Sequence, residues 1–247
     1  MIQIAMKSKG AVDRSSILSL NVPRTAGNRF PAAASGAAKP ARPADIKTTE
    51  SPAAPSAARP VPPLKHPVQK GQKAHLSPGT PLKSIRACFG WNTSHPQCDV
   101  DVSAFLLGAD GKVPGDSWFV FYGQTVSPDQ STEFTELASA DREMIRIDLQ
   151  KLDPKVKKIV FVLTINDAFA KKLNFGMIKD AYVRILDGAG AAELVSFQMT
   201  EYYSNVISMM IGEVYNHNGL WKFNAVGNGV AKDLEGLCGL YGVQVSH

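Results

Sequence analysis

The segment Ile159-Val-Phe-Val-Leu-Thr-Ile165 is the most apolar run in this chain of 247 residues. Its β-branched and aromatic residues favour a strand, and the lack of alternation with polar residues predicts that both faces are covered. Asn166 and Asp167 follow directly, so polar groups emerge where the core stops. The run therefore predicts the central strand of a sheet that ends at a polar rim.

A second strand is expected over Asp99-Val-Asp-Val-Ser-Ala-Phe-Leu-Leu107. Successive side chains of a strand point to opposite faces, so Asp99 and Asp101 share a face and lie roughly 7 Å apart. At an effective dielectric of about 20 the two charges repel by roughly 2 kcal/mol, against about 0.6 in water. A partly buried pair needs a cation, whereas a solvated strand end does not, and the residues alone leave both interpretations open.

The Asp-x-Asp-x-Ser pattern also suggests an EF-hand, which we reject. The sixth position of that loop requires Gly and here is Ala104, while the twelfth is Asp110 where the loop has Glu. The residues between them are apolar, which suits a strand.

From Ser84 onward, short β-rich runs alternate with turn signals, a pattern typical of a sandwich. Strands are expected at 85–91, 100–107, 118–122, 144–149, 158–165, 181–186, 192–198, 208–214, 220–226 and 243–245. Tight turns are expected at Asp110-Gly111-Lys112, at 187–190 and at His217-Asn218-Gly219, and short helical pieces at 174–180 and 231–240. The predicted fold class is all-β dominated: a two-sheet antiparallel β-sandwich with a few short helices.

The N-terminal region differs sharply in composition. Residues 1–80 carry 12 Lys and Arg against 3 Asp and Glu, a net charge of +9, while the remainder has a net charge of −4. The region also holds 11 of the 16 prolines, and an Ala/Pro-rich segment cannot bury enough apolar surface to offset the entropy of ordering it. We expect a largely disordered extension over 1–68 and a folded domain over 69–247.

Composition also limits location and chemistry. No window approaches the ~20 apolar residues of a membrane span, and charged residues interrupt any secretory signal. Three cysteines, with no C-x-x-C spacing, suggest neither a zinc site nor a disulfide framework. We therefore expect a reduced, cytoplasmic protein.

The chain contains a series of short motifs: Phe89-Gly-Trp91, Cys98 to Lys112, Phe119-Val-Phe-Tyr122, Ile147-Asp-Leu149, Lys158 to Ala168, Asn174-Phe-Gly176 and Trp221 to Gly229, with 234–245 at the end. Their order is similar to the order in the TerD family of tellurium-resistance and stress-response proteins. The chain resembles this family over about residues 69–245. The resemblance implies a calcium-binding β-sandwich without known catalytic activity, and partners among other Ter-type stress-response proteins.

The resemblance also implies where a metal would bind. Paired aspartates, the aspartate after the central strand and the end of an acidic loop match five residues here: Asp99, Asp101, Asp141, Glu143 and Asp167. The loop between Tyr122 and Ile145 departs from the family, because its only Gly is Gly123 and its acids are spread out. A tight calcium wrap usually needs Gly so that carbonyls can turn inward, so we expect the site to bind calcium weakly or not at all.

Two functions remain as hypotheses. The first is a non-enzymatic TerD-type domain in bacterial stress or tellurite resistance. The alternative is an adaptor whose basic arm recruits the domain to an anionic membrane surface or another anionic partner. No specific nucleic-acid motif is present, and none of the five histidines lies in a recognisable catalytic setting.

Overall fold

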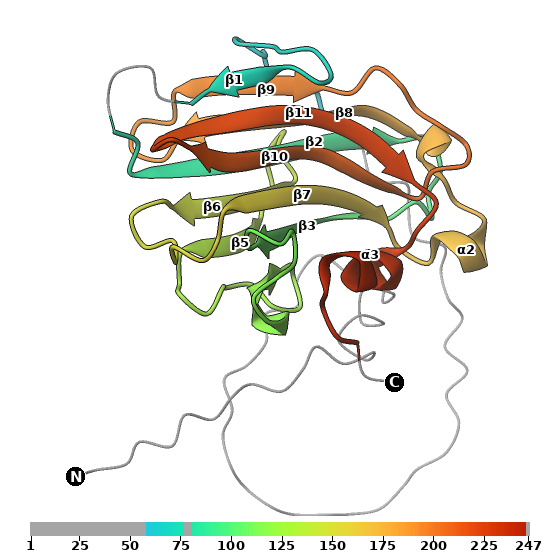
Figure 1. The fold of residues 1–247 in the computed structure, drawn as a ribbon. Coiled ribbons are helices and arrows are strands. Elements are labelled where there is room, and N and C mark those ends of the chain that lie inside the picture. The colour runs from blue at the N-terminus through green and yellow to red at the C-terminus, as the bar shows by residue number, and fades with distance from the viewer. Residues whose placement is uncertain (1–57, 77–80, 246–247) are drawn as a thin grey trace, which may run out of the picture.

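A computed structural model describes residues 58–76 and 81–245 of the chain (Figure 1). Strands are the predominant regular structure in these residues. The elements are β1 (Lys73–His75), β2 (Ser84–Thr93), β3 (Val100–Leu107), η2 (Asp116–Trp118), β4 (Phe119–Val120), β5 (Thr132–Glu136), β6 (Glu143–Asp148), β7 (Lys158–Ile165), α2 (Ala168–Lys171), η3 (Phe175–Met177), β8 (Ile178–Asp187), β9 (Glu193–Gln198), β10 (Ser208–His217), β11 (Leu220–Val230) and α3 (Leu234–Tyr241).

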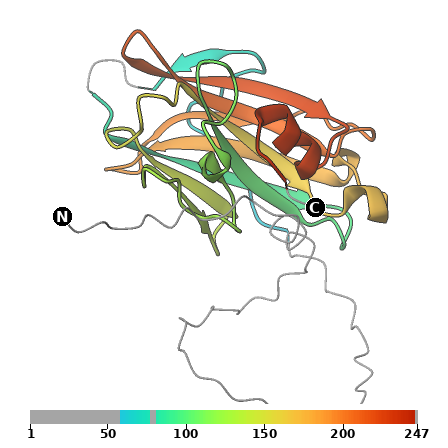
Figure 2. The same cartoon turned by 60° about the horizontal axis from the view of Figure 1, so that its bottom comes forward.

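The described strands form two antiparallel sheets that face each other (Figures 1 and 2). One has six strands in the order β1-β11-β10-β7-β3-β4, and the other has five in the order β5-β6-β2-β8-β9. The two-sheet antiparallel sandwich with few, short helices confirms the predicted fold class.

Strand β7 is an internal strand of the six-stranded sheet and is covered on both faces, as its apolar run predicts. Ile159, Phe161 and Leu163 belong to the core between the sheets, whereas Val160 and Val162 belong to a second cluster on the outer face. Helix α3 supplies Leu234, Leu237 and Cys238 to that second cluster, and Figure 2 shows it against this side of the sheet. In a sandwich of two sheets alone, the outer face of each sheet is open to solvent. Helix α3 covers the apolar outer face of β7, which would otherwise be exposed.

Local sequence signals explain several connections. Asn218 and Gly219 have φ values of 53° and 80° and join β10 to β11 through the expected two-residue hairpin. Helix α3 ends at Gly242, whose φ is 82°, and the N–H of Val243 then donates to the carbonyl of Cys238. This C-terminal cap turns the chain back onto the helix, and residues 243–245 form no strand, contrary to expectation.

Two other local expectations differ from the structure. The segment 174–180 contains only the short η3, capped by the Asn174 side chain, before β8 begins at Ile178. The loop after Tyr122 contains β5, which was not predicted because its Thr and Glu residues carry no strong apolar alternation. Thr132 and Phe134 are its buried residues, and β5 forms the edge of the five-stranded sheet beside β6.

The chain before β1 lies along the sandwich from residue 58 onward. Pro67 forms a parallel bridge with Ser196 of β9, and β1 pairs with β11 of the other sheet. These contacts join the β9 edge to the β1 edge and limit the exposure of unpaired backbone groups. The expected extension over 1–68 thus includes a stretch, 58–68, that the structure places on the domain, while residues 1–57 lie outside the described residues.

Candidate functional site

The predicted acidic residues lie near the polar ends of three strands. Val100 pairs with Ile165, and the N–H of Asn166 donates to the carbonyl of Asp99 at 2.9 Å, so the start of β3 meets the end of β7. The start of β6 also approaches β3 through Glu143. The backbone therefore brings the predicted segments to neighbouring positions, and the side chains decide whether they form one site.

Asp141 is buried and binds Arg184 of β8. Arg184 Nε and Nη2 donate to its two carboxylate oxygens at 3.0 and 2.6 Å, and the hydroxyl of Tyr182 donates to Oδ1 at 3.0 Å. The hydrogen bonds to Asp141 raise the pKa of Arg184, while burial, then the Asp141 charge, raises that of Tyr182. Asp141 is thus the acceptor of a bidentate ion pair, which is a strong interaction at a buried position.

This ion pair lies on the outer face of the five-stranded sheet. Val183 and Ile185 point into the core, so Arg184 and Tyr182 point outward. The Tyr182 ring crosses Gly90 of β2, where an added Cβ would lie 2.3 Å from the ring. Only Gly permits this close approach, which places the hydroxyl beside Asp141.

Sequence reasoning missed Arg184 and Tyr182. Alternation along the expected strand 181–186 assigns both residues to the same face, but nothing local marks a carboxylate more than forty positions earlier as their partner. The pairing is therefore a tertiary property.

Glu143 has a different role. It is buried, and its Oε2 accepts the N–H of Val102 at 2.7 Å. Val102 lies where β3 extends beyond the short β4, whose pairing covers only Ala104 and Phe105. Glu143 thus takes a backbone donor that β4 leaves uncovered, which accounts for a carboxylate at this buried position.

The three other predicted residues lie at the start of β3 and just after the end of β7. Asp101 is buried in β3 opposite Thr164, and Asp99 is half-buried just before the strand. Asp167 precedes α2 with a φ of 53°, and one of its oxygens lies 3.4 Å from Lys171 Nζ. That contact is an i,i+4 pair at the surface of a short helix.

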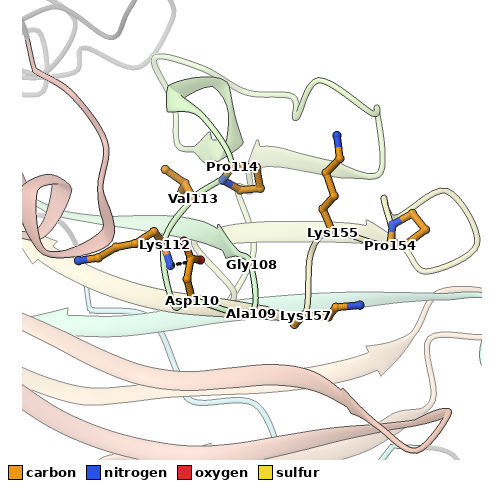
Figure 3. A pocket seen from close by; sticks show the side chains of 9 residues that line it. All are labelled: Gly108, Ala109, Asp110, Lys112, Val113, Pro114, Pro154, Lys155 and Lys157. Atoms are coloured by element: carbon orange, nitrogen blue, oxygen red, sulfur yellow. Dashed lines mark hydrogen bonds between the residues drawn. The ribbon is translucent and has the colours of Figure 1, made fainter.

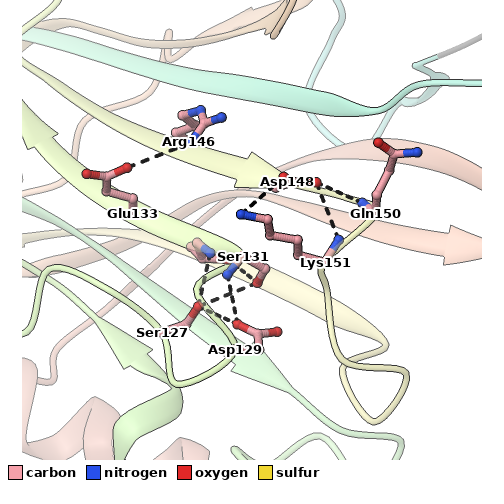
Figure 4. A network of polar contacts seen from close by, with 9 residues as sticks. Ser127, Asp129, Ser131, Glu133, Arg146, Asp148, Gln150 and Lys151 are labelled. Carbon is pink, nitrogen blue, oxygen red and sulfur yellow. Dashed lines mark hydrogen bonds and ion pairs between the residues drawn. The ribbon is translucent and has the colours of Figure 1, made fainter.

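The acidic loop uses Asp129 to hold its own turn (Figure 4). Asp129 Oδ1 accepts from Ser127 Oγ at 2.6 Å and from the N–H of Ser131 at 3.0 Å, and Oδ2 accepts the N–H of Asp153 at 2.9 Å. Burial opposes ionisation, but these hydrogen bonds outweigh it and lower the pKa of Asp129. The Asp129 carboxylate therefore stabilises the loop.

Calcium takes six to eight oxygen ligands. In residues 58–76 and 81–245, no group of three or more His, Cys, Asp or Glu side chains is arranged to hold a metal ion. Asp141 is bound to Arg184, and Glu143 to the backbone of Val102. These carboxylates do not fit a ready-made calcium site in this arrangement, and calcium binding by the five residues stays a prediction.

The cysteines offer little nucleophilic chemistry. Cys88, Cys98 and Cys238 are all buried and free, and burial raises the pKa of each thiol to about 12. A thiol reacts as its thiolate, so we expect these residues to react slowly near neutral pH while the protein is folded.

A pocket of about 580 Å³ lies between the turn after β3 and the loop before β7 (Figure 3). Three lysines contribute to its lining: Lys112, Lys155 and Lys157. Lys112 Nζ donates to the carbonyl of Leu240, and Asp110 accepts the N–H of Lys112. Exposed lysines on flexible stems attract anions without fixing their geometry, so this pocket defines no substrate.

A family model described as the TerD domain matches residues 64–241. The chain belongs to the TerD family. The matched residues include all strands from β1 to β11 and reach the last residue of α3. The resemblance carried by the sequence motifs is thereby confirmed.

Three relatives with named roles agree with this family. The tellurium resistance protein TerD of Serratia marcescens is 38% identical over 188 residues, which span 72% of this chain and 98% of that protein. General stress protein 16U of Bacillus subtilis is 35% identical over 186 residues, spanning 71% of this chain and 96% of that protein. Chemical-damaging agent resistance protein B of Clostridium acetobutylicum is 33% identical over 138 residues, spanning 54% and 99%. The names of these relatives describe tellurium resistance, general stress and resistance to chemical-damaging agents.

No helix in the described ranges combines the length and apolar composition needed to cross a bilayer.

Proposed function

We propose that this chain is a non-catalytic TerD domain that acts by binding in bacterial stress or tellurium resistance. The observation that carries the proposal is the TerD match across the sandwich, at 38% identity to a tellurium resistance protein almost throughout that protein's length. The buried thiols, with pKa values near 12, support a role without nucleophilic catalysis.

Expression in a tellurite-sensitive bacterium that lacks TerD-type genes tests this function. Survival on tellurite and after oxidative damage is expected to rise with the wild-type chain. Serine substitutions at the three cysteines are expected to keep the protection, because the proposal assigns those thiols no chemistry. Absence of protection by well-expressed, folded protein contradicts the assignment, and loss of protection in folded serine variants contradicts the non-catalytic role.

The charge distribution favours a second candidate, an adaptor with a basic arm. A net charge of +9 over residues 1–80 against −4 over the rest attracts anionic surfaces to the arm. Binding of the full chain to vesicles containing phosphatidylserine is expected to weaken as salt rises and to fall when residues 1–57 are deleted. Binding that responds to neither change excludes the arm as the recruiting element.

Calcium remains a separate prediction. To bind at the five acidic residues, the ion would need Asp141 to exchange Arg184 for the metal and Glu143 to leave Val102.

A further inference from the structure

The outer face of the five-stranded sheet is covered by a segment of the chain that precedes β1. Cys88, Tyr182 and Leu186 are only 3%, 2% and 7% exposed, yet none of them belongs to either apolar core cluster. In the described part of the chain, residues 58–67 cross this face, between contacts near β2 and contacts on β9.

Arg59 anchors one end of this segment. Its backbone N–H and carbonyl form a pair of hydrogen bonds with the side-chain amide of Asn92, at 2.8 and 2.9 Å. Its guanidinium donates to the carbonyls of Leu137 and Ser139 at 3.1 and 2.7 Å. Both bonds are donated by Nη1, so the positive end of the Arg59 side chain lies among backbone carbonyls.

The other end of the segment is held by β9. Glu193 Oε1 accepts the N–H groups of Lys65 and His66 at 2.7 and 2.8 Å. The N–H of Ser196 donates to the His66 carbonyl, and the N–H of Val68 donates to the Ser196 carbonyl. This end therefore adds a short stretch of extended chain to a sheet edge, a known mode of peptide recognition.

The segment between the anchors is extended. Asn92 pairs with Lys179 and Glu193 with Leu186, so the anchor points lie seven residues apart along β8, roughly 23 Å. The six residue-to-residue steps from Arg59 to Lys65 span at most about 21 Å, and the side chains of the two anchors supply the remaining reach.

The sequence between the anchors suits an extended ligand. Pro60, Pro62 and Pro63 restrict the backbone there, Pro67 does so just beyond the second anchor, and these prolines lower the entropy lost on docking. The side chains of Arg59, Val61, Pro62 and Leu64 are half-buried, while Ala58, Pro60, Pro63 and Lys65 are exposed. The segment thus presents one side to the sheet and the other to solvent.

The anchor is also an addition to the family domain. The TerD match begins at residue 64, after Arg59. The Serratia relative is matched over 98% of its length by 72% of this chain, so this chain carries sequence outside the shared domain. The binding surface therefore belongs to the TerD domain, whereas Arg59 belongs to the sequence that precedes it. This division is expected if the segment is a ligand that can leave the domain.

We propose that the outer face of β2, β8 and β9 is a recognition surface for an extended, proline-rich peptide anchored by arginine, and that residues 58–67 occupy it as an intramolecular ligand. Asn92 and the loop carbonyls bind the arginine, and Glu193 with Ser196 binds the backbone. The tethered segment competes with any external peptide at an effective concentration near the millimolar range. The inference does not depend on the proposed stress function.

A labelled peptide with the sequence of residues 57–68 tests the proposal by fluorescence anisotropy against the full-length chain. The Arg59→Ala variant loses hydrogen bonds made by a charged donor, so its own segment is released more readily. We expect it to bind the peptide at least about tenfold more tightly than the wild-type chain does. The matched control is Lys65→Ala, because Lys65 contributes its backbone N–H and has an exposed side chain; it is expected to behave as the wild type.

A peptide in which arginine is replaced by alanine is expected to bind Arg59→Ala at least about tenfold more weakly than the original peptide. Equal binding of the two peptides, or equal binding of the original peptide by the wild type and a folded Arg59→Ala variant, overturns the proposal. If Arg59→Ala does not fold, Arg59→Met keeps the apolar part of the side chain and removes the charged donor, and the same comparisons apply to it.

Discussion

Replacing Asp141 by asparagine is expected to destabilise the sandwich strongly. Asparagine keeps the shape of the side chain and can still accept from Tyr182, but it leaves Arg184 as an uncompensated cation. The side chains of Asp141 and Arg184 are 8% and 21% exposed. Breaking a fully buried pair by removing one partner costs about 3–5 kcal/mol, and the partial exposure of Arg184 places this case near 3 kcal/mol.

Urea unfolding monitored by tryptophan fluorescence measures this loss. For an m value of about 2 kcal/mol/M, the midpoint is expected to fall by about 1.5 M. The matched control is Glu133→Gln, which breaks a 3.9 Å pair with Arg146 in which both side chains are 51% exposed. That pair is expected to contribute less than about 0.5 kcal/mol.

A second substitution distinguishes burial of the charge from loss of shape. Adding Arg184→Met to Asp141→Asn removes the unpaired cation and is expected to recover part of the lost stability. Equal midpoints for Asp141→Asn and Glu133→Gln, or no recovery in the double variant, would refute the assignment of Asp141 to a buried ion pair.

Three further predictions concern the thiols, the acidic loop and calcium. At pH 8 a pKa near 12 leaves about one thiolate in ten thousand, so the cysteines of the folded chain are expected to resist iodoacetamide and to react after unfolding; rapid native labelling contradicts this. Asp129→Asn is expected to cost about 1 kcal/mol at pH 7. Because the folded pKa of Asp129 is lowered, the wild type holds this stability above the unfolded pKa and loses it as the pH falls below about 4, whereas the variant lacks that dependence in denaturation curves at several pH values. Calcium at 1 mM is expected to leave the thermal midpoint within about 1 °C, and a rise that grows with calcium concentration would show that the carboxylates rearrange to bind it.

Much of the fold follows from patterns visible in the sequence. The apolar run of β7 predicts a strand covered on both faces, and the Asn218-Gly219 dipeptide predicts the hairpin that the structure shows. These features depend on local chemistry. Strand β5 and the end of the chain after Gly242 depend instead on neighbouring strands and on a helix cap, which alternation does not reveal.

The candidate site was less accessible to sequence reasoning. The order of the motifs identifies Asp99, Asp141 and Asp167 as candidate metal ligands. It does not indicate which group each carboxylate binds. Arg184 binds Asp141 across 43 positions, and Arg59 reaches carbonyls 78 to 80 positions away. Such contacts are fixed by the packing of the sheets.

Amide hydrogen exchange of the full chain tests the central structural claim, that residues 58–67 are bound across the outer face of the domain. The N–H groups of Lys65, His66 and Val68 donate to Glu193 and Ser196, so they are expected to exchange well below the rate of an unstructured peptide, and faster in Arg59→Ala. Exchange of these three amides at the unprotected rate in the wild-type chain would contradict the account.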